Sequence, residues 1–118
     1  YEQALQQFPS NDALWLARID TLLQARRSAE ARQQIELALK RAPDNAALWR
    51  LAARSYGEGD ALRYHAALGH AFYIEQEFES ARIQYQLASR AGGDDFYLRS
   101  TVEARLREID TQHPGKPR

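Results

Sequence analysis

The chain has 118 residues, with 16 basic and 16 acidic side chains, three histidines and no cysteine. This length is enough for one domain with a modest core. The zero formal net charge argues against nucleic acid or an anionic membrane surface as a partner. The longest apolar runs are about four residues, far short of the roughly twenty that span a bilayer, so no membrane insertion is expected. The absence of cysteine excludes disulfides and thiolate zinc sites.

The first half of the chain repeats itself at a spacing of 34 residues, as in Trp15 and Trp49 or Pro9 and Pro43. This spacing is the period of the tetratricopeptide repeat, a pair of antiparallel helices, and the sequence resembles that family. Numbering a repeat from Asp12 places most large and small residues where the family has them. Ile19 departs from the pattern, because the family has a small residue at this close helix crossing, so we expect this repeat to pack differently.

Apolar periodicity and helix-breaking residues predict an all-α chain. The predicted helices cover residues 11–25, 28–41, 45–57, 60–75, 77–91 and 95–110. Residues 1–8 are expected to complete the second helix of a repeat that begins before the chain. The expected N-caps are Asn11, Ser28, Asn45, Asp60 and Asp94. The predicted fold is therefore a tetratricopeptide-repeat α-solenoid of antiparallel helix pairs with a C-terminal capping helix.

The repeat changes phase after its second copy. A unit that starts at Ala46 loses the repeat pattern, and a better register starts at Leu62. Ala31 and Ala81 are 50 residues apart, which corresponds to one repeat plus one helix. We therefore expect the helix over residues 61–74 to be shared by two repeats. The predicted divisions of a repeat domain over 1–110 are a truncated repeat (1–9), a repeat (12–45), an irregular repeat (46–75), a repeat (62–93) and a capping helix (94–110), followed by a disordered tail (111–118).

No catalytic constellation is visible in the sequence. His65 and His70 lie five residues apart, whereas zinc-binding pairs on a helix need the H-E-x-x-H spacing, and His113 lies in the predicted tail. No serine has a nucleophile-elbow context and no glycine loop is suited to phosphate. We therefore expect neither enzymatic activity, nor a metal site, nor a cofactor in this chain.

A binding groove is the better prospect. In tetratricopeptide arrays the first helices of each pair line a concave groove, and the resemblance implies groove candidates here: Asp20, Arg50, Arg54, Arg63, His70 and Tyr73. Arg50, Arg54 and Arg63 would form a basic strip that holds a carboxylate or an acidic segment, with Tyr73 stacking nearby. The alternative is that these arginines are simply the solvated faces of their helices.

The stretch from Tyr64 to Ile109 carries a more particular resemblance. It is similar to the C-terminal tetratricopeptide region of bacterial zinc metallopeptidases of the beta-barrel assembly-enhancing protease (BepA-like) kind, mainly through DDFYLRSTVEARLREI at residues 94–109. The resemblance implies a periplasmic parent whose own catalytic domain holds zinc and which acts as protease and chaperone on outer-membrane proteins. This chain would then recruit substrates or the assembly machinery and pack against the peptidase domain. The alternative is a stand-alone scaffold or adaptor with no protease attached.

Overall fold

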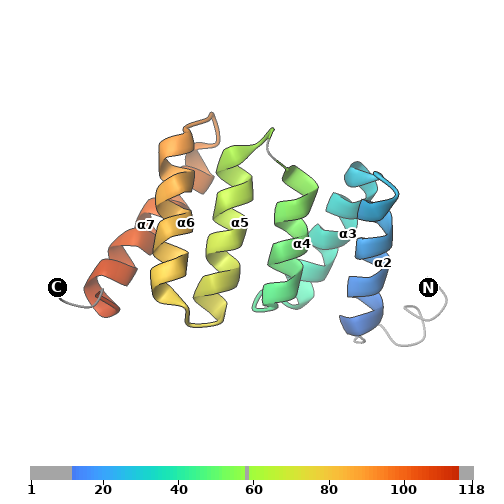
Figure 1. Ribbon diagram of the computed structural model, residues 1–118, viewed down its shortest axis with the longest axis horizontal. Helices are drawn as coiled ribbons and strands as arrows, with labels where there is room; N and C mark the ends of the chain where they lie inside the picture. Colours follow the sequence, from blue (N-terminus) through green and yellow to red (C-terminus); the bar gives the residue numbers. More distant parts are fainter. Residues whose placement is uncertain (1–11, 58, 115–118) are drawn as a thin grey trace.

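A computed structural model describes residues 12–57 and 59–114 (Figure 1). Helices account for about four fifths of this part of the chain, and no strand occurs in it. Helices α2, α4, α5 and α6 stand side by side in an elongated row, with α3 and α7 lying obliquely behind them, and short turns connect successive helices. They are α2 (Asp12–Gln24), α3 (Ser28–Arg41), α4 (Ala46–Tyr56), α5 (Ala61–Ile74), α6 (Phe78–Ala91) and α7 (Phe96–Gln112). The predicted all-α solenoid is confirmed, and the predicted helices agree with the observed ones to within two residues at each end.

The predicted N-caps of α4 and α5 form, and that of α3 does not. The side chains of Asn45 and Asp60 each accept a hydrogen bond from the backbone N–H three residues further on, which satisfies a donor that the first turn of a helix leaves unpaired. The prediction for Ser28 is wrong, because Ser28 is already the first residue of α3. Arg27 holds the cap position there and makes no side-chain cap bond. Asn11 lies outside the described residues.

The last helix begins and ends differently from the prediction. Asp95 rather than Asp94 caps it, through a 2.9 Å bond from the Leu98 N–H to the Asp95 carboxylate. Helix α7 continues two residues beyond the expected end, to Gln112, so residues 111 and 112 are helical rather than part of a disordered tail. His113 then stacks on Phe78, with ring centroids 3.6 Å apart. Residues 115–118 lie outside the described part of the chain.

The described helices form two three-helix units offset by 50 residues. In the first, α2 contacts α3 and α4, and in the second, α5 contacts α6 and α7; α4 and α5 join the units. Each unit has its own cluster of buried side chains, with Ala67 of α5 reaching into the first cluster. Corresponding buried residues are Ala31 and Ala81, Ile35 and Tyr85, Ala38 and Ala88, and Ala52 and Val102. Helix α5 thus packs against helices of both units, as expected of a shared helix, while the division into repeats stays a prediction.

The turns after α2 and α5 repeat the same backbone geometry. Arg26 and Gln76 have left-handed backbones, with φ of 61° and 64°. In each turn the next N–H bonds back to a carbonyl five residues earlier at 2.9 Å, which is the closure that satisfies the last carbonyls of a helix. The 50-residue offset therefore extends to the turns as well as to the core.

The two units fill the close crossing of their first two helices with different side chains. In the first unit both Ile19 and Ile35 are buried in the core, at 0% and 3% exposure. At the corresponding positions of the second unit stand Gly69 and Tyr85, and a Cβ on Gly69 would lie 2.6 Å from Cε1 of Tyr85. The side chain that fills the crossing comes from both helices in the first unit and from α6 alone in the second. The first unit thus has a larger residue than the family pattern on α2, Ile19, and on α3 a smaller residue than the second unit has on α6, Ile35 in place of Tyr85.

No helix within residues 12–57 and 59–114 combines the length and the apolar character that crossing a membrane requires.

Candidate functional groove

A groove lies between α2 and α4 and has a volume of about 410 Å³. Its lining residues are Leu16, Ala17, Asp20, Ala47, Arg50, Leu51 and Arg54. The four that come from α4 follow the i, i+3, i+4, i+7 spacing, so they share one face of that helix. We call this feature the α2–α4 groove. It brings together three of the predicted site residues, Asp20, Arg50 and Arg54.

The middle of the α2–α4 groove is apolar. Leu16 and Leu51 are partly buried and pack against the core of the first unit, while Ala47 is exposed and adds little bulk. The charged side chains that line the groove therefore border an apolar strip. This combination can take up an apolar side chain and a charged group at the same time.

An ion pair between α2 and α4 borders the groove. Arg54 Nη1 donates to Asp20 Oδ1 at 2.6 Å, and Gln24 donates to the other carboxylate oxygen at 2.9 Å. Asp20 and Arg54 are 34 residues apart, so they hold the same position in successive repeats. Both side chains remain exposed, Arg54 at 49% and Asp20 at 40%, and such a pair adds little to stability in water.

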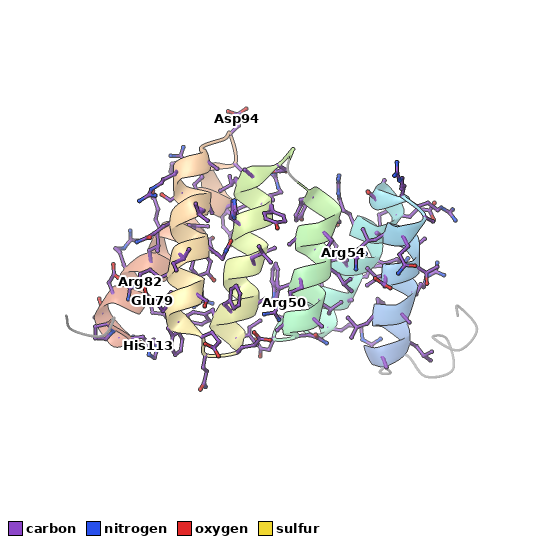
Figure 2. All side chains as sticks on the ribbon, viewed as in Figure 1. Arg50, Arg54, Glu79, Arg82, Asp94 and His113 are labelled. Atoms are coloured by element: carbon purple, nitrogen blue, oxygen red, sulfur yellow. The ribbon has the colours of Figure 1, made fainter. Side chains whose placement is uncertain are left out.

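Arg50 and Arg54 start on the same face of α4, but the guanidinium of Arg50 turns toward α5 whereas that of Arg54 turns toward α2 (Figure 2). The two terminal nitrogens of Arg50 donate to the two carboxylate oxygens of Glu75, both at 2.7 Å. The guanidinium also lies over the Phe72 ring, 5.2 Å from its centroid. The hydrogen bonds from Arg50 lower the pKa of Glu75, and the same bonds raise the pKa of Arg50. This is the planar two-bond geometry that makes arginine selective for carboxylates.

Arg63 lies apart from the α2–α4 groove and does not line it. It donates to Asp60 at 2.9 Å and to Asp95 at 2.7 Å, and so ties the start of α5 to the start of α7. The hydrogen bond to Asp60 is the largest cause of the raised pKa of Arg63. The three predicted arginines thus do not form one uninterrupted strip, since each is paired with a carboxylate and Arg63 belongs to another junction.

Tyr73 and His70 line a second hollow of about 670 Å³, between the α3–α4 turn and helices α5 and α7. Tyr73 therefore does not stack beside the groove arginines. Arg105 lies over its ring instead, 4.2 Å from the centroid, and its hydroxyl donates to Glu108. That hydrogen bond raises the pKa of Tyr73 and lowers the pKa of Glu108.

His70 is packed among aromatic rings rather than offered to a ligand. Its ring centroid lies 4.6 Å from that of Trp49 and 5.4 Å from that of Tyr85, and its Nδ1 is 2.7 Å from the Tyr85 hydroxyl. Burial, followed by the nearby charge of Arg105, lowers the pKa of His70 to about 4. Burial also raises the pKa of Tyr85. His70 is therefore a neutral, hydrogen-bonded core residue at neutral pH.

The other histidines are also engaged in contacts with protein side chains. His65 Nδ1 lies 2.8 Å from Gln84 Oε1, and His113 is stacked on Phe78. Across residues 12–57 and 59–114, no three side chains of the metal-ligating types gather closely enough to hold an ion.

The site residue that sequence reasoning misses is Glu75. It follows α5 directly and lies 25 residues from Arg50, so neither the 34-residue period nor the helical spacing links the two. The Asp20–Arg54 pair, in contrast, is signalled by that period, because equal positions in adjacent repeats lie side by side.

The matches to known proteins agree with this geometry. Residues 1–55 match the family model described as tetratricopeptide repeat. No curated protein and no solved structure matches the chain at a significant level. The match and the row of antiparallel helix pairs together give an all-α tetratricopeptide-repeat solenoid, a helical module for protein–protein interaction, with the α2–α4 groove inside the matched segment.

Proposed function

We propose that this module binds an extended acidic segment of a partner protein in the α2–α4 groove. The observation that carries the proposal is the placement of Arg50 and Arg54 one turn apart on the face of α4 that lines an apolar-centred groove. An apolar side chain of the partner would lie on Leu16 and Leu51 and gain the free energy of leaving water. Carboxylates beside it would bind the two arginines, whose planar donor groups fit them.

A bulky residue in the groove is expected to block the partner without disturbing the fold. Ala47 is exposed and lines the groove, so Ala47→Trp would fill the space through steric exclusion. We expect about tenfold or greater loss of affinity for a fluorescein-labelled Glu-Ser-Glu-Ser-Leu peptide, whose two glutamates and leucine share one face when extended, a contribution of about 1.4 kcal/mol or more. The measurement is fluorescence anisotropy with the full chain, with circular dichroism to check the helix content.

The matched control is Ala104→Trp, at an exposed position of α7 that does not line the groove. It should leave peptide affinity unchanged. The charge reversals Arg50→Glu and Arg54→Glu should each weaken binding. Equal affinity of the wild type, Ala47→Trp and the two reversals would contradict binding in this groove.

We further propose that the module is the non-catalytic arm of a periplasmic zinc metallopeptidase that works in outer-membrane protein quality control. The support is the resemblance of residues 64–109 to the C-terminal region of such enzymes, with the closing stretch at 94–109 as its most specific part. Outer-membrane proteins, their assembly machinery and the enzyme's own peptidase domain would then be the partners, and the zinc would belong to that domain. The alternative is a scaffold or adaptor with no protease attached.

The sequence upstream of Tyr1 in the parent gene separates these two proposals. A signal peptide followed by H-E-x-x-H supports the peptidase arm, because that motif supplies two zinc ligands and the general base. A reading frame that holds neither supports the scaffold. The purified chain by itself should release no peptides from casein when zinc is added, and zinc-dependent proteolysis by pure material would contradict a non-catalytic arm.

A further inference from the structure

We propose that Glu75 and Asp20 are built-in competitors for the two groove arginines, Arg50 and Arg54, and that the partner segment displaces them with two carboxylates separated by one residue. This inference rests on the proposed function, since it names the chemistry of the partner at the same groove. It is carried by the two ion pairs that already occupy Arg50 and Arg54.

The Arg50–Glu75 ion pair has the geometry expected of arginine with a bound carboxylate ligand. Both carboxylate oxygens of Glu75 receive a guanidinium nitrogen at 2.7 Å, the arrangement expected for a partner's carboxylate. Glu75 stands in the short turn after α5 and its side chain is 40% exposed, with that of Arg50 at 39%. Because both groups remain in contact with water, an incoming carboxylate can replace Glu75 without opening the core.

The pair with Asp20 occupies the second arginine in a similar way. Asp20 accepts from Arg54 at 2.6 Å and from Gln24 at 2.9 Å. When an incoming carboxylate takes Arg54, Asp20 keeps its bond to Gln24, which lies one turn further along α2. Neither member of the pair is left buried and unpaired by the exchange, because both side chains are at least 40% exposed, so the large penalty for an orphaned charge does not arise.

The distance between the two arginines selects the spacing of the acidic residues. Side chains at i and i+4 of a helix have Cβ atoms about 5–6 Å apart. In an extended segment, alternate side chains project to the same face about 6.6 Å apart, whereas adjacent ones project to opposite faces. When Arg50 and Arg54 leave Glu75 and Asp20 and turn to the face of α4 that they share, two carboxylates separated by one residue match their spacing, and two adjacent carboxylates do not. Arg50 and Arg54 now turn to opposite sides of α4 (Figure 2), toward their internal partners.

The test compares variants of the internal competitor against labelled peptides. Glu75→Gln removes the competing charge at Arg50, and we expect it to tighten binding of Glu-Ser-Glu-Ser-Leu by about two- to fivefold, in line with the small strength of exposed ion pairs. Asp20→Asn should tighten it similarly. The matched control is Glu77→Gln, which changes the net charge by the same amount two residues away, and which forms no ion pair within the described residues. It should leave affinity unchanged apart from a small, salt-screened effect.

The second part of the experiment varies the spacing of the two glutamates in the peptide. A peptide with adjacent glutamates, Glu-Glu-Ser-Ser-Leu, has the same composition and charge but projects its second glutamate to the opposite face, so it should bind more weakly and gain less from Glu75→Gln. If the wild type binds the peptide but Glu75→Gln and Glu77→Gln have equal affinities, the competitor inference is wrong and groove binding stands. If the two peptides bind equally, the spacing is wrong. If neither peptide binds the wild type or any variant, acidic-segment binding itself fails.

Discussion

Replacing Gly69 by alanine is expected to destabilise the second three-helix unit by about 1–3 kcal/mol, the usual cost of overpacking a core. The new Cβ would lie 2.6 and 2.7 Å from two carbons of the Tyr85 ring, which is closer than any non-bonded carbon contact tolerates. Tyr85 is fully buried, and its hydroxyl is held by His70 at 2.7 Å. The ring therefore cannot move aside without losing both packing and a buried hydrogen bond.

The first unit shows which compensation should restore the fold. There the same crossing holds Ile19 and Ile35 in place of a glycine and a tyrosine. Gly69→Ile alone should be at least as harmful as Gly69→Ala, and Tyr85→Ile alone should leave a cavity. The double variant Gly69→Ile with Tyr85→Ile should be more stable than the sum of the single changes predicts, because removing the Tyr85 ring frees the space that a side chain at position 69 enters.

The measurement is urea unfolding, followed by circular dichroism, of the wild type, Gly69→Ala, Gly69→Ile, Tyr85→Ile and the double variant. The coupling free energy comes from the cycle of the two isoleucine variants and their double variant. Rescue will be incomplete, since Tyr85→Ile removes the hydroxyl that pairs with His70. Purely additive effects would contradict direct packing of the side chains at positions 69 and 85 against each other.

The helices can be predicted from the sequence because their signals are local. Asn45 and Asp60 mark the starts of α4 and α5 by their own side chains, and both caps form. The offset between Ala31 and Ala81 likewise predicts that α5 packs on both sides, as it does. The predicted cap of α7 is wrong by one residue, because two successive aspartates compete for the position and only the backbone decides that Asp95 takes it.

The candidate site can be predicted only in part, because pairing across helices depends on where long side chains end. Position in the repeat places Asp20, Arg50 and Arg54 in one groove, and the structure brings them together. Position in the repeat does not predict that Arg63 reaches Asp95, 32 residues away, or that Glu75 is already paired with Arg50. The same limit applies at the tail. Pro and Gly favour disorder there, whereas His113 is fixed by stacking on Phe78 and by a 3.2 Å bond from Arg82 to its carbonyl.

The fold is expected to lose about 3 kcal/mol of unfolding free energy through His70 alone between pH 6.5 and pH 4. The pKa of His70 is lowered from 6.5 to about 4, and a tenfold difference in proton affinity between the folded and unfolded chains corresponds to about 1.4 kcal/mol. The unfolded chain takes up a proton as the pH falls through 6.5, while the folded chain does not until about pH 4. Protonation therefore favours unfolding across this window, and the contribution of His70 is fully present only above pH 6.5.

The variant His70→Gln isolates this effect. A neutral amide can still bond to the Tyr85 hydroxyl but takes up no proton, so the variant should be less stable than the wild type at pH 7 and should lose less stability on acidification. Urea unfolding at pH 7 and pH 4.5 measures both, and His65→Gln controls for the loss of an imidazole from the same helix. The lowered pKa values of Glu75 and Glu108 also reduce stability in acid, but their contribution is common to all three proteins. An equal loss in the wild type and His70→Gln would therefore mean that His70 is not held neutral by its contacts with Trp49 and Tyr85.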